Sequence, residues 1–307
     1  MDHKKYAPIA VTKSFYQIGT PNYPAYLTLG DDGMIIEGGT GATYPILVEQ
    51  IEGLGIKPER IKYLALTHTH PDHIGAVPNL TRRWPHLKVV AGEVATRLLQ
   101  NEEVVKEFSR VDGVITEILM IKGDIDEWPP ETVDPKFPID RVLKDGDTID
   151  LGAGVTWRMY QTPGHSSCHV SYYNQGEGIV IIADATGLYN AQKDLFWPNY
   201  FDSLESYCAS MRKLALLGAS IGALSHNGIV RDATGHVRKA VKATEDYHNR
   251  MLERVAKGED PKKVALDLAR WVYTFTNLQP FEVIFGLARL MMKRSQAAAG
   301  KEGLFKI

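Results

Sequence analysis

The stretch Thr67-His68-Thr69-His70-Pro71-Asp72-His73-Ile74-Gly75 carries three histidines and a carboxylate within six residues. It follows an apolar run at 61–66 that predicts a strand, and a predicted helix over 76–84 comes after it. Along an extended backbone, alternate side chains point the same way, so His68 and His70 can reach one metal ion. After the turn, Asp72 and His73 can face a second ion. Imidazole nitrogens and carboxylate oxygens are donors that zinc and iron(II) both accept, and neither metal then needs a thiolate.

Three further candidate ligands follow predicted strands in the second half of the chain. His165 follows the strand predicted over 155–161, at a Pro-Gly turn. Asp184 comes just after the apolar strand predicted over 179–182, and His226 just after the one predicted over 221–224. Layered α/β proteins hold functional groups at such strand ends, on a rigid scaffold. These three side chains are therefore expected to complete a metal site.

Strands and helices alternate through residues 12–110, which predicts an α/β layered fold. One helix is expected over 93–107, and the proline-rich stretch near 111–140 predicts an irregular insertion. Beyond residue 233 the pattern is helical only, with helices expected over 234–256, 261–275 and 280–293. We therefore expect a catalytic domain over 1–232, with the insertion at about 111–140, and an all-helical extension over 233–307.

The composition excludes several classes of protein. In 307 residues, 35 Lys and Arg oppose 37 Asp and Glu, and this near-neutral balance does not indicate nucleic acid as a partner. Two cysteines can form neither a disulfide framework nor a zinc site of four thiolates. No apolar segment follows the charged N-terminus, and no stretch approaches the roughly 18 apolar residues of a membrane span. A cytoplasmic location and a small-molecule substrate are therefore expected.

The identity and order of these residues resemble the metallo-β-lactamase superfamily over roughly residues 12–230. The resemblance implies an αββα sandwich with two divalent metal ions, zinc first and iron or manganese as alternatives. Asp184 resembles the glyoxalase II and thioesterase branches rather than the true lactamases. The resemblance further implies one ion on His68, His70 and His165, a second on Asp72, His73 and His226, and Asp184 as the bridge between the ions.

The resemblance implies hydrolysis by a metal-activated water, with Asp72 as the catalytic group that accepts or steers its proton. The helical tail and the insertion are similar to those of glyoxalase II and of 2-aminobenzoylacetyl-CoA thioesterase, so a thioester or related ester is the expected substrate. Lactones and phosphodiesters remain alternatives on the same site. A mononuclear iron oxidoreductase similar to persulfide dioxygenases is another alternative, using His68, His165 and Asp184. A non-enzymatic binding protein and a flavodiiron-type electron carrier are less favoured. Substrate-binding residues are not predicted.

Three further features have alternative interpretations. His169 could orient a metal ligand without touching the ion, or face solvent from the start of its strand. Cys168 and Cys208 are expected to be small buried residues rather than nucleophiles. Aromatic and apolar side chains of the tail and of the segment before it could line a hydrophobic pocket, form a homodimer surface, or pack the tail onto the sandwich: Trp197, Tyr200, Phe201, Trp271, Phe275, Phe281, Phe285, Leu290 and Met291.

Overall fold

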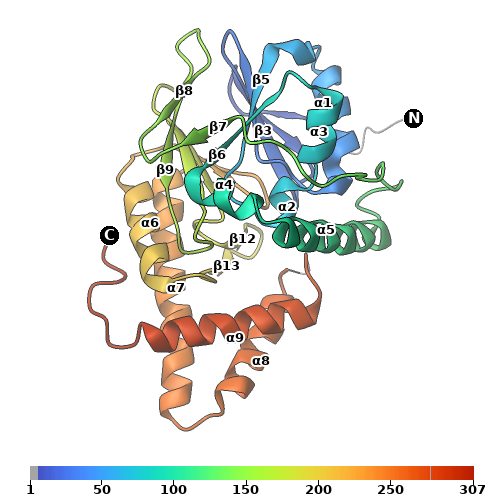
Figure 1. Cartoon of the computed structure of the whole chain (residues 1–307). Coiled ribbons are helices and arrows are strands. Elements are labelled where there is room, and N and C mark those ends of the chain that lie inside the picture. The colour runs from blue at the N-terminus through green and yellow to red at the C-terminus, as the bar shows by residue number, and fades with distance from the viewer. Residues whose placement is uncertain (1–5, 277) are drawn as a thin grey trace. The chain divides into compact units, whose positions relative to one another are not determined.

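The computed structural model describes residues 6–276 and 278–307 (Figure 1). The N-terminal residues on which the expectation of no signal peptide depends lie outside the described residues. The chain forms two compact units. The first runs to Gln161 and includes Val170–Glu177, and the second holds Thr162–His169 and Gly178–Ile307. The domain boundary expected between 232 and 233 stays a prediction.

A mixed sheet of seven strands forms one layer of the first unit. Its first four strands pair antiparallel, and the fourth to the seventh pair parallel, so the strand that leads into the histidine motif, β5, lies in the parallel half. In sheet order the strands are β1 (Ile9–Ala10), β2 (Phe15–Gly19), β3 (Pro24–Leu29), β4 (Gly33–Ile36), β5 (Ile61–Ala65), β6 (Lys88–Gly92) and β7 (Arg141–Leu143).

Three antiparallel strands form a second layer in the same unit: β8 (Thr148–Asp150), β9 (Thr156–Gln161) and β10 (Val170–Asn174). The β9 side chains alternate, so Trp157 is buried while its neighbours on the strand are exposed. The Trp157 ring lies 5.6 Å from that of Phe15, and its indole N–H donates to the hydroxyl oxygen of Thr28 at 3.1 Å. Phe15 and Thr28 belong to β2 and β3, so the two layers pack face to face around an apolar core.

Helices of the first unit differ from expectation in one region. They are α1 (Tyr44–Gly53), α2 (Pro71–Ile74), α3 (Val77–Arg83), α4 (Glu93–Leu99) and α5 (Glu102–Lys122), with short 3-10 turns at Gly41–Thr43 and Pro58–Arg60. The single helix expected over 93–107 is wrong, because the Asn101 side chain accepts from the backbone of Glu103 and Val104 and starts a new helix.

The irregular insertion expected from residue 111 is also wrong in its first part. Residues 111–122 are helical, and α5 ends only where Gly123 takes the left-handed conformation, with φ 69°. Gly113 weakens the helical pattern of the sequence, but α5 packs against α2, and the Asp112 carboxylate accepts from the backbone N–H of Gly41 at 2.9 Å. Tertiary contacts thus override a weak local propensity, and the irregular stretch is confined to 124–140.

The second unit contains three strands of a six-stranded sheet and a separate hairpin. The strand β11 (Ile179–Ala183) pairs parallel with β14 (Ile221–Leu224), and β14 pairs antiparallel with β15 (Ile229–Val230). The hairpin joins β12 (Leu188–Asn190) and β13 (Leu195–Trp197). The strands β12, β13 and β15 were not expected, because runs of two or three residues carry no measurable period. The helix α6 (Leu204–Ala215) follows the hairpin.

The helical tail agrees with expectation to within a few residues. Its helices are α7 (Ala233–Ala256), α8 (Pro261–Tyr273) and α9 (Phe281–Ala297). Asp232 and Asp260 cap the first two, each by accepting from a backbone N–H in the first turn. The helices α8 and α9 pack together and against α7, which also contacts α6 and β13 (Figure 1).

The tail buries part of its apolar surface within the second unit. Phe275 and Met291 are buried, whereas Trp271, Phe281 and Phe285 are half-buried. Packing of the tail therefore accounts for some of the apolar residues, and a homodimer surface stays a prediction. Over residues 6–276 and 278–307, none of the helices combines the length and the apolarity needed to cross a membrane.

Candidate metal centre

The first unit holds the histidine motif in the loop after β5 and in α2, beside a carboxylate that the sequence interpretation missed. This carboxylate, Glu37, follows β4 and is 1% exposed. One of its oxygens accepts from the Thr67 hydroxyl at 2.7 Å, and the other accepts from Nδ1 of His73 at 2.7 Å. Nδ1 of His68 lies 3.0 Å from the same Thr67 hydroxyl. Glu37 therefore ties the hydrogen bonds of two neighbouring imidazoles together.

The direction of these hydrogen bonds assigns the tautomers of His68 and His73. An ionised carboxylate can only accept, so the Thr67 proton points to Glu37 and the Thr67 oxygen accepts from Nδ1 of His68. His73 likewise donates from Nδ1. Both rings therefore carry a proton on Nδ1, and a neutral imidazole in this tautomer binds a metal ion through Nε2.

Distances inside the motif fit donor atoms that share an ion. Nε2 of His68 and Nδ1 of His70 are 3.1 Å apart, close to the roughly 3.3 Å separation of two nitrogens on a tetrahedral zinc. Nε2 of His73 lies 3.4 Å from a carboxylate oxygen of Asp72. His68 and His73 are buried, and His70 and Asp72 are partly exposed. The structure thus brings the four candidate ligands of the first unit together as expected, in two pairs.

The second unit brings the other three candidate ligands together. Nε2 of His165 lies 3.9 Å from one Asp184 carboxylate oxygen, and Nε2 of His226 lies 3.8 Å from the other. Nδ1 of His165 donates to the backbone carbonyl of Asn199 at 3.0 Å, so a neutral His165 ring carries its proton on Nδ1 and would bind an ion through Nε2. Asp184 is 2% exposed, so its carboxylate is costly to keep ionised without a cation nearby.

His169 contacts the backbone of Asp184 rather than solvent. It is 1% exposed, its Nε2 accepts from the Asp184 N–H at 3.2 Å, and its Nδ1 lies 2.9 Å from the Thr162 hydroxyl. The preceding residue, Ala183, has φ 51°, and the pairing of β11 with β14 shifts register there. This bulge turns Asp184 out of the strand, and His169 holds the turned backbone. That His169 orients a ligand in the metal-bound protein stays a prediction.

The donor set fits divalent ions bound by nitrogen and oxygen. Three imidazoles carry a proton on Nδ1, so Nε2 is the nitrogen through which each would bind, and carboxylates accompany the imidazoles in both units. Thiolates do not contribute: Cys168 and Cys208 are buried, and burial raises the pKa of the Cys208 thiol to about 12. The identity and number of the ions stay predictions.

Two functional residues escaped the sequence interpretation for different reasons. Glu37 could have been found, because an acidic residue ends the apolar run 34–36 just before a pair of glycines. Asn199 acts through its backbone carbonyl, and no side-chain pattern signals such a role.

Comparison with known proteins agrees with this geometry. Residues 22–226 match the family model of the metallo-beta-lactamase superfamily. Diflavin flavoprotein A 1 of Synechocystis is 25% identical over 82% of this chain and 44% of its own length. Atrochrysone carboxyl ACP thioesterase of Aspergillus fumigatus is 24% identical over 74% of this chain and 56% of its own length. The chain therefore spans about half the length of these two relatives.

A solved structure supports the same fold over nearly the whole chain. A metallo-beta-lactamase family protein from Thermus thermophilus superimposes with a TM-score of 0.63 at 21% identity, covering 94% of both chains. The fold is thus the αββα sandwich with a helical C-terminal extension, as expected. Because the family model matches well over half of the sequence, the chain belongs to the metallo-beta-lactamase superfamily.

Proposed function

We propose that the chain is a metal-dependent hydrolase with a dinuclear centre, acting on a thioester or a related ester. The observation that carries the proposal is the carboxylate of Asp184, whose two oxygens face two different histidines, His165 and His226. A carboxylate in this arrangement is suited to bridge two ions, each held by one of the histidines.

The proposed ligands divide into two sets that share Asp184. His68, His70 and His165 would hold the first ion, and Asp72, His73 and His226 the second. Two bound divalent ions would supply Lewis acidity and a water that is acidic near neutral pH. The contacts of Glu37 and Asn199 keep the Nε2 lone pairs of three of these histidines available.

Asp72 is the proposed acceptor of the proton that the attacking water loses. Its side chain is 12% exposed, so it remains accessible to water while lying beside His73. The Tyr23 hydroxyl stays protonated, because burial and the nearby Asp72 charge raise its pKa. Of the Asp72 carboxylate and the Tyr23 hydroxyl, Asp72 is therefore the better acceptor for the proton of the attacking water.

The acyl substrate is supported by a relative and by aromatic side chains beside His165. A relative named as an acyl carrier protein thioesterase matches 74% of this chain. Phe201 lies with its ring 5.2 Å from that of His165 and 5.9 Å from that of Trp197, so an aromatic surface adjoins a proposed ligand. Such a surface suits the apolar part of an acyl group.

Measured metal content together with a substrate panel tests the proposal. We expect about two divalent ions per chain, and hydrolysis of thioesters ahead of lactones and phosphodiesters. Asp72→Asn should lower kcat by roughly 10²- to 10⁴-fold, whereas the exposed His86→Gln should leave it unchanged. Less than one ion per chain, with no hydrolysis across the panel, would refute the proposal.

A redox function on the same residues is the second candidate. It is favoured by the match of 82% of this chain to a protein named as a diflavin flavoprotein, since flavins carry redox chemistry. An iron centre on His68, His165 and Asp184 would serve it. Iron as the bound metal, with oxygen uptake on glutathione persulfide and no ester hydrolysis, would favour this function over the hydrolase.

A further inference from the structure

The C-terminal helix α9 contacts a loop that holds one of the proposed ligands. We propose that Arg294 and Ser295 of α9 are positioning residues for His165, acting through the loop 199–201. The proposal rests on the proposed metal centre. All of these residues belong to the second unit. The tail would then take part in metal binding without supplying a ligand.

The loop touches His165 at two points. The Asn199 carbonyl accepts from Nδ1 of the ring at 3.0 Å, and the Phe201 ring packs 5.2 Å from it. The same carbonyl also accepts from the Phe201 N–H at 2.8 Å. A displacement of Phe201 would therefore move both the acceptor and the aromatic contact of His165.

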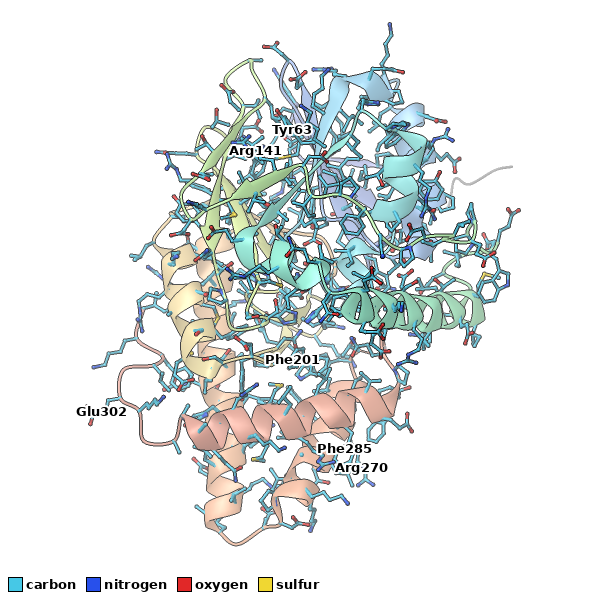
Figure 2. All side chains as sticks on the ribbon, viewed as in Figure 1. Tyr63, Arg141, Phe201, Arg270, Phe285 and Glu302 are labelled. Carbon is cyan, nitrogen blue, oxygen red and sulfur yellow. The ribbon has the colours of Figure 1, made fainter. Side chains whose placement is uncertain are left out.

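The helix α9 holds the loop with two hydrogen bonds. Nε of Arg294 donates to the Phe201 carbonyl at 3.0 Å. The hydroxyls of Tyr200 and Ser295 lie 2.9 Å apart, and both residues are fully buried. Figure 2 labels Phe201 on the stretch of chain that lies next to α9. Consecutive residues of the helix thus bind consecutive residues of the loop.

These bonds matter because the loop has little regular structure of its own. The strand β13 ends at Trp197, and α6 begins at Leu204, so residues 198–203 lie outside helices and strands. The hydrogen bond from the Asn199 N–H to the Tyr207 hydroxyl is long, at 3.4 Å. The backbone N–H groups of Asp202 and Ser203 donate to the Gly164 carbonyl at 3.0 and 3.1 Å, which holds the end of the loop. Residues 199–201 instead have side-chain anchors, two of which come from α9.

The position of the loop determines which tautomer of His165 is favoured. While the Asn199 carbonyl accepts from Nδ1, the proton stays on that nitrogen and Nε2 keeps its lone pair. If the carbonyl moves away, the Nδ1–H loses a buried acceptor, and the tautomer protonated at Nε2 becomes competitive. That second tautomer cannot bind an ion through Nε2.

Arg294→Gln with the matched control Arg289→Gln tests the role of α9. Both arginines lie on α9, but Arg289 is exposed and packs over Phe285. In the metal-free protein, the ¹⁵N signals of His165 should show the tautomer protonated at Nδ1 in wild type and in Arg289→Gln, and a mixture of tautomers in Arg294→Gln. Metal affinity, measured by competition with a chelator, should fall roughly 10-fold in Arg294→Gln alone. Arg294→Lys should restore part of both readouts.

Ser295→Ala provides a second route that removes only one hydroxyl. It should shift the same His165 signals, so the test remains available if Arg294→Gln does not fold. Unchanged tautomer and affinity in both variants would overturn the positioning role. A wild-type protein that binds no metal would instead refute the proposed function, and the signals of the metal-free protein would still decide whether α9 positions His165.

Discussion

Glu37 shows how one buried carboxylate can prepare two imidazoles for metal binding. Its two oxygens take the hydroxyl proton of Thr67 and the Nδ1 proton of His73, and the Thr67 oxygen in turn accepts from His68. No member of this chain of hydrogen bonds can reverse its direction while the carboxylate is ionised. The tautomers in which His68 and His73 would bind an ion through Nε2 therefore depend on Glu37, a residue that need not touch the ion.

Replacing Glu37 with glutamine should weaken metal binding. The amide keeps the shape but offers one acceptor and one donor, so the hydrogen bond to either Thr67 or His73 must reverse, which favours a tautomer of His68 or His73 protonated at Nε2. We expect a 10- to 100-fold loss of metal affinity in Glu37→Gln, measured by chelator competition. Glu52→Gln is the control, because Glu52 is exposed and pairs with Arg83 at the surface. Equal affinities in the two variants would contradict the role of Glu37.

His236 should make stability depend on pH. Burial and the nearby Lys239 lower its pKa from 6.5 to about 4 in the folded chain. The unfolded chain therefore binds more protons between these values, so the free energy of unfolding should be greatest above about pH 6.5 and fall by up to roughly 3 kcal/mol as the pH drops toward 4.

Urea unfolding at a series of pH values measures this effect. His236→Gln should show a smaller decline between pH 6.5 and 4 than His86→Gln, in which an exposed histidine is changed. Parallel curves for the two variants would show that another group controls the pH dependence.

Candidate ligand side chains could be proposed from sequence because their chemistry is visible in their identity and spacing. The four residues of the histidine motif need only the geometry of a strand end followed by a turn. Asn199 and Phe201 could not be predicted, since a backbone carbonyl and a ring contact depend on where a loop lies in three dimensions. Sequence patterns therefore reveal candidate metal-binding side chains more readily than they reveal the residues that orient those side chains.

At the scale of elements, the sequence predicted helices well where their apolar residues recur regularly and a capping residue marks the start. It did not predict helical segments that depend on tertiary contacts. Asp232 and Asp260 cap the starts of α7 and α8, and an aspartate at such a position is a helix-start signal that can be recognised in the sequence. The second half of α5 contains Gly113 and depends on its packing against α2 and on Asp112. The length of such a helix follows from contacts that a local pattern does not contain.

The approach of α6 to the loop of His165 depends on a glycine. Gly164 has φ 130°, and a Cβ there would lie 2.3 Å from the backbone of Tyr207. Gly164→Ala should therefore lower the free energy of unfolding by about 2–5 kcal/mol. Gly286→Ala, in α9 with open space around it, should raise it by about 0.5–1 kcal/mol. Denaturant unfolding of both variants measures the difference, and a change of the same sign would contradict the close-approach argument.

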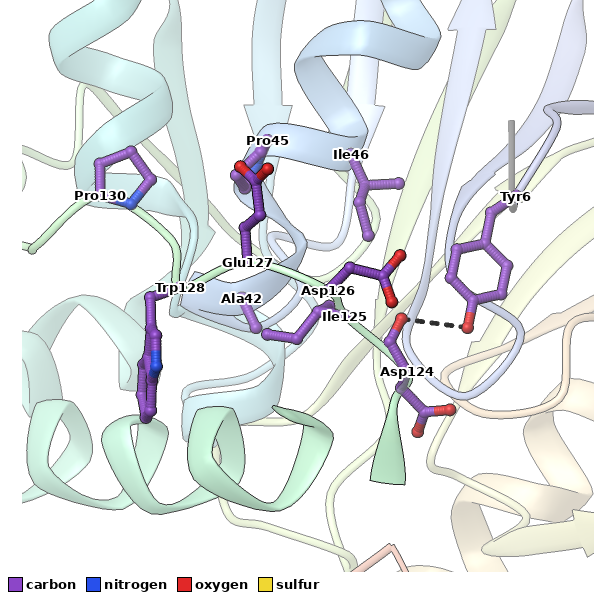
Figure 3. A pocket seen from close by; sticks show the side chains of 10 residues that line it. All are labelled: Tyr6, Ala42, Pro45, Ile46, Asp124, Ile125, Asp126, Glu127, Trp128 and Pro130. Carbon is purple, nitrogen blue, oxygen red and sulfur yellow. Dashed lines mark hydrogen bonds between the residues drawn. The ribbon is translucent and has the colours of Figure 1, made fainter. Parts of the chain in front are cut away.

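The first unit also carries a cavity that the proposed function leaves unused. Its volume is about 260 Å³, and Tyr6, Ile46, Asp124 and Trp128 are among the residues that line it (Figure 3). The Tyr6 hydroxyl donates to the Asp124 carbonyl at 3.1 Å and closes one side. Much of the lining comes from the irregular stretch 124–140, where the irregular structure expected from sequence is present.

At the scale of the whole molecule, the order of the seven candidate ligands along the chain predicted the fold better than any single helix or strand did. Each candidate follows a strand or starts a short helix, so a fold that supplies those strand ends supplies the site. The tail was predicted as helices, but its contacts with the loop 199–201 were not, because Arg294 and Ser295 carry no sign of them in sequence.

Removal of metal should destabilise the entire protein. Ions that bind the folded chain and not the unfolded one add about 4 kcal/mol when free metal exceeds Kd by 1,000-fold. A chelator should therefore lower the Tm of wild type and abolish hydrolysis, and added zinc should restore both. In the double variant His165→Ala and Asp184→Ala the chelator should shift the Tm much less, because only His226 is left of the proposed donors of the second unit. The measurement is thermal unfolding with metal content determined on the same samples. A wild-type protein that loses its metal while its Tm stays constant would show that the ions do not stabilise the fold, and the proposed ligands would then have to be sought elsewhere in the chain.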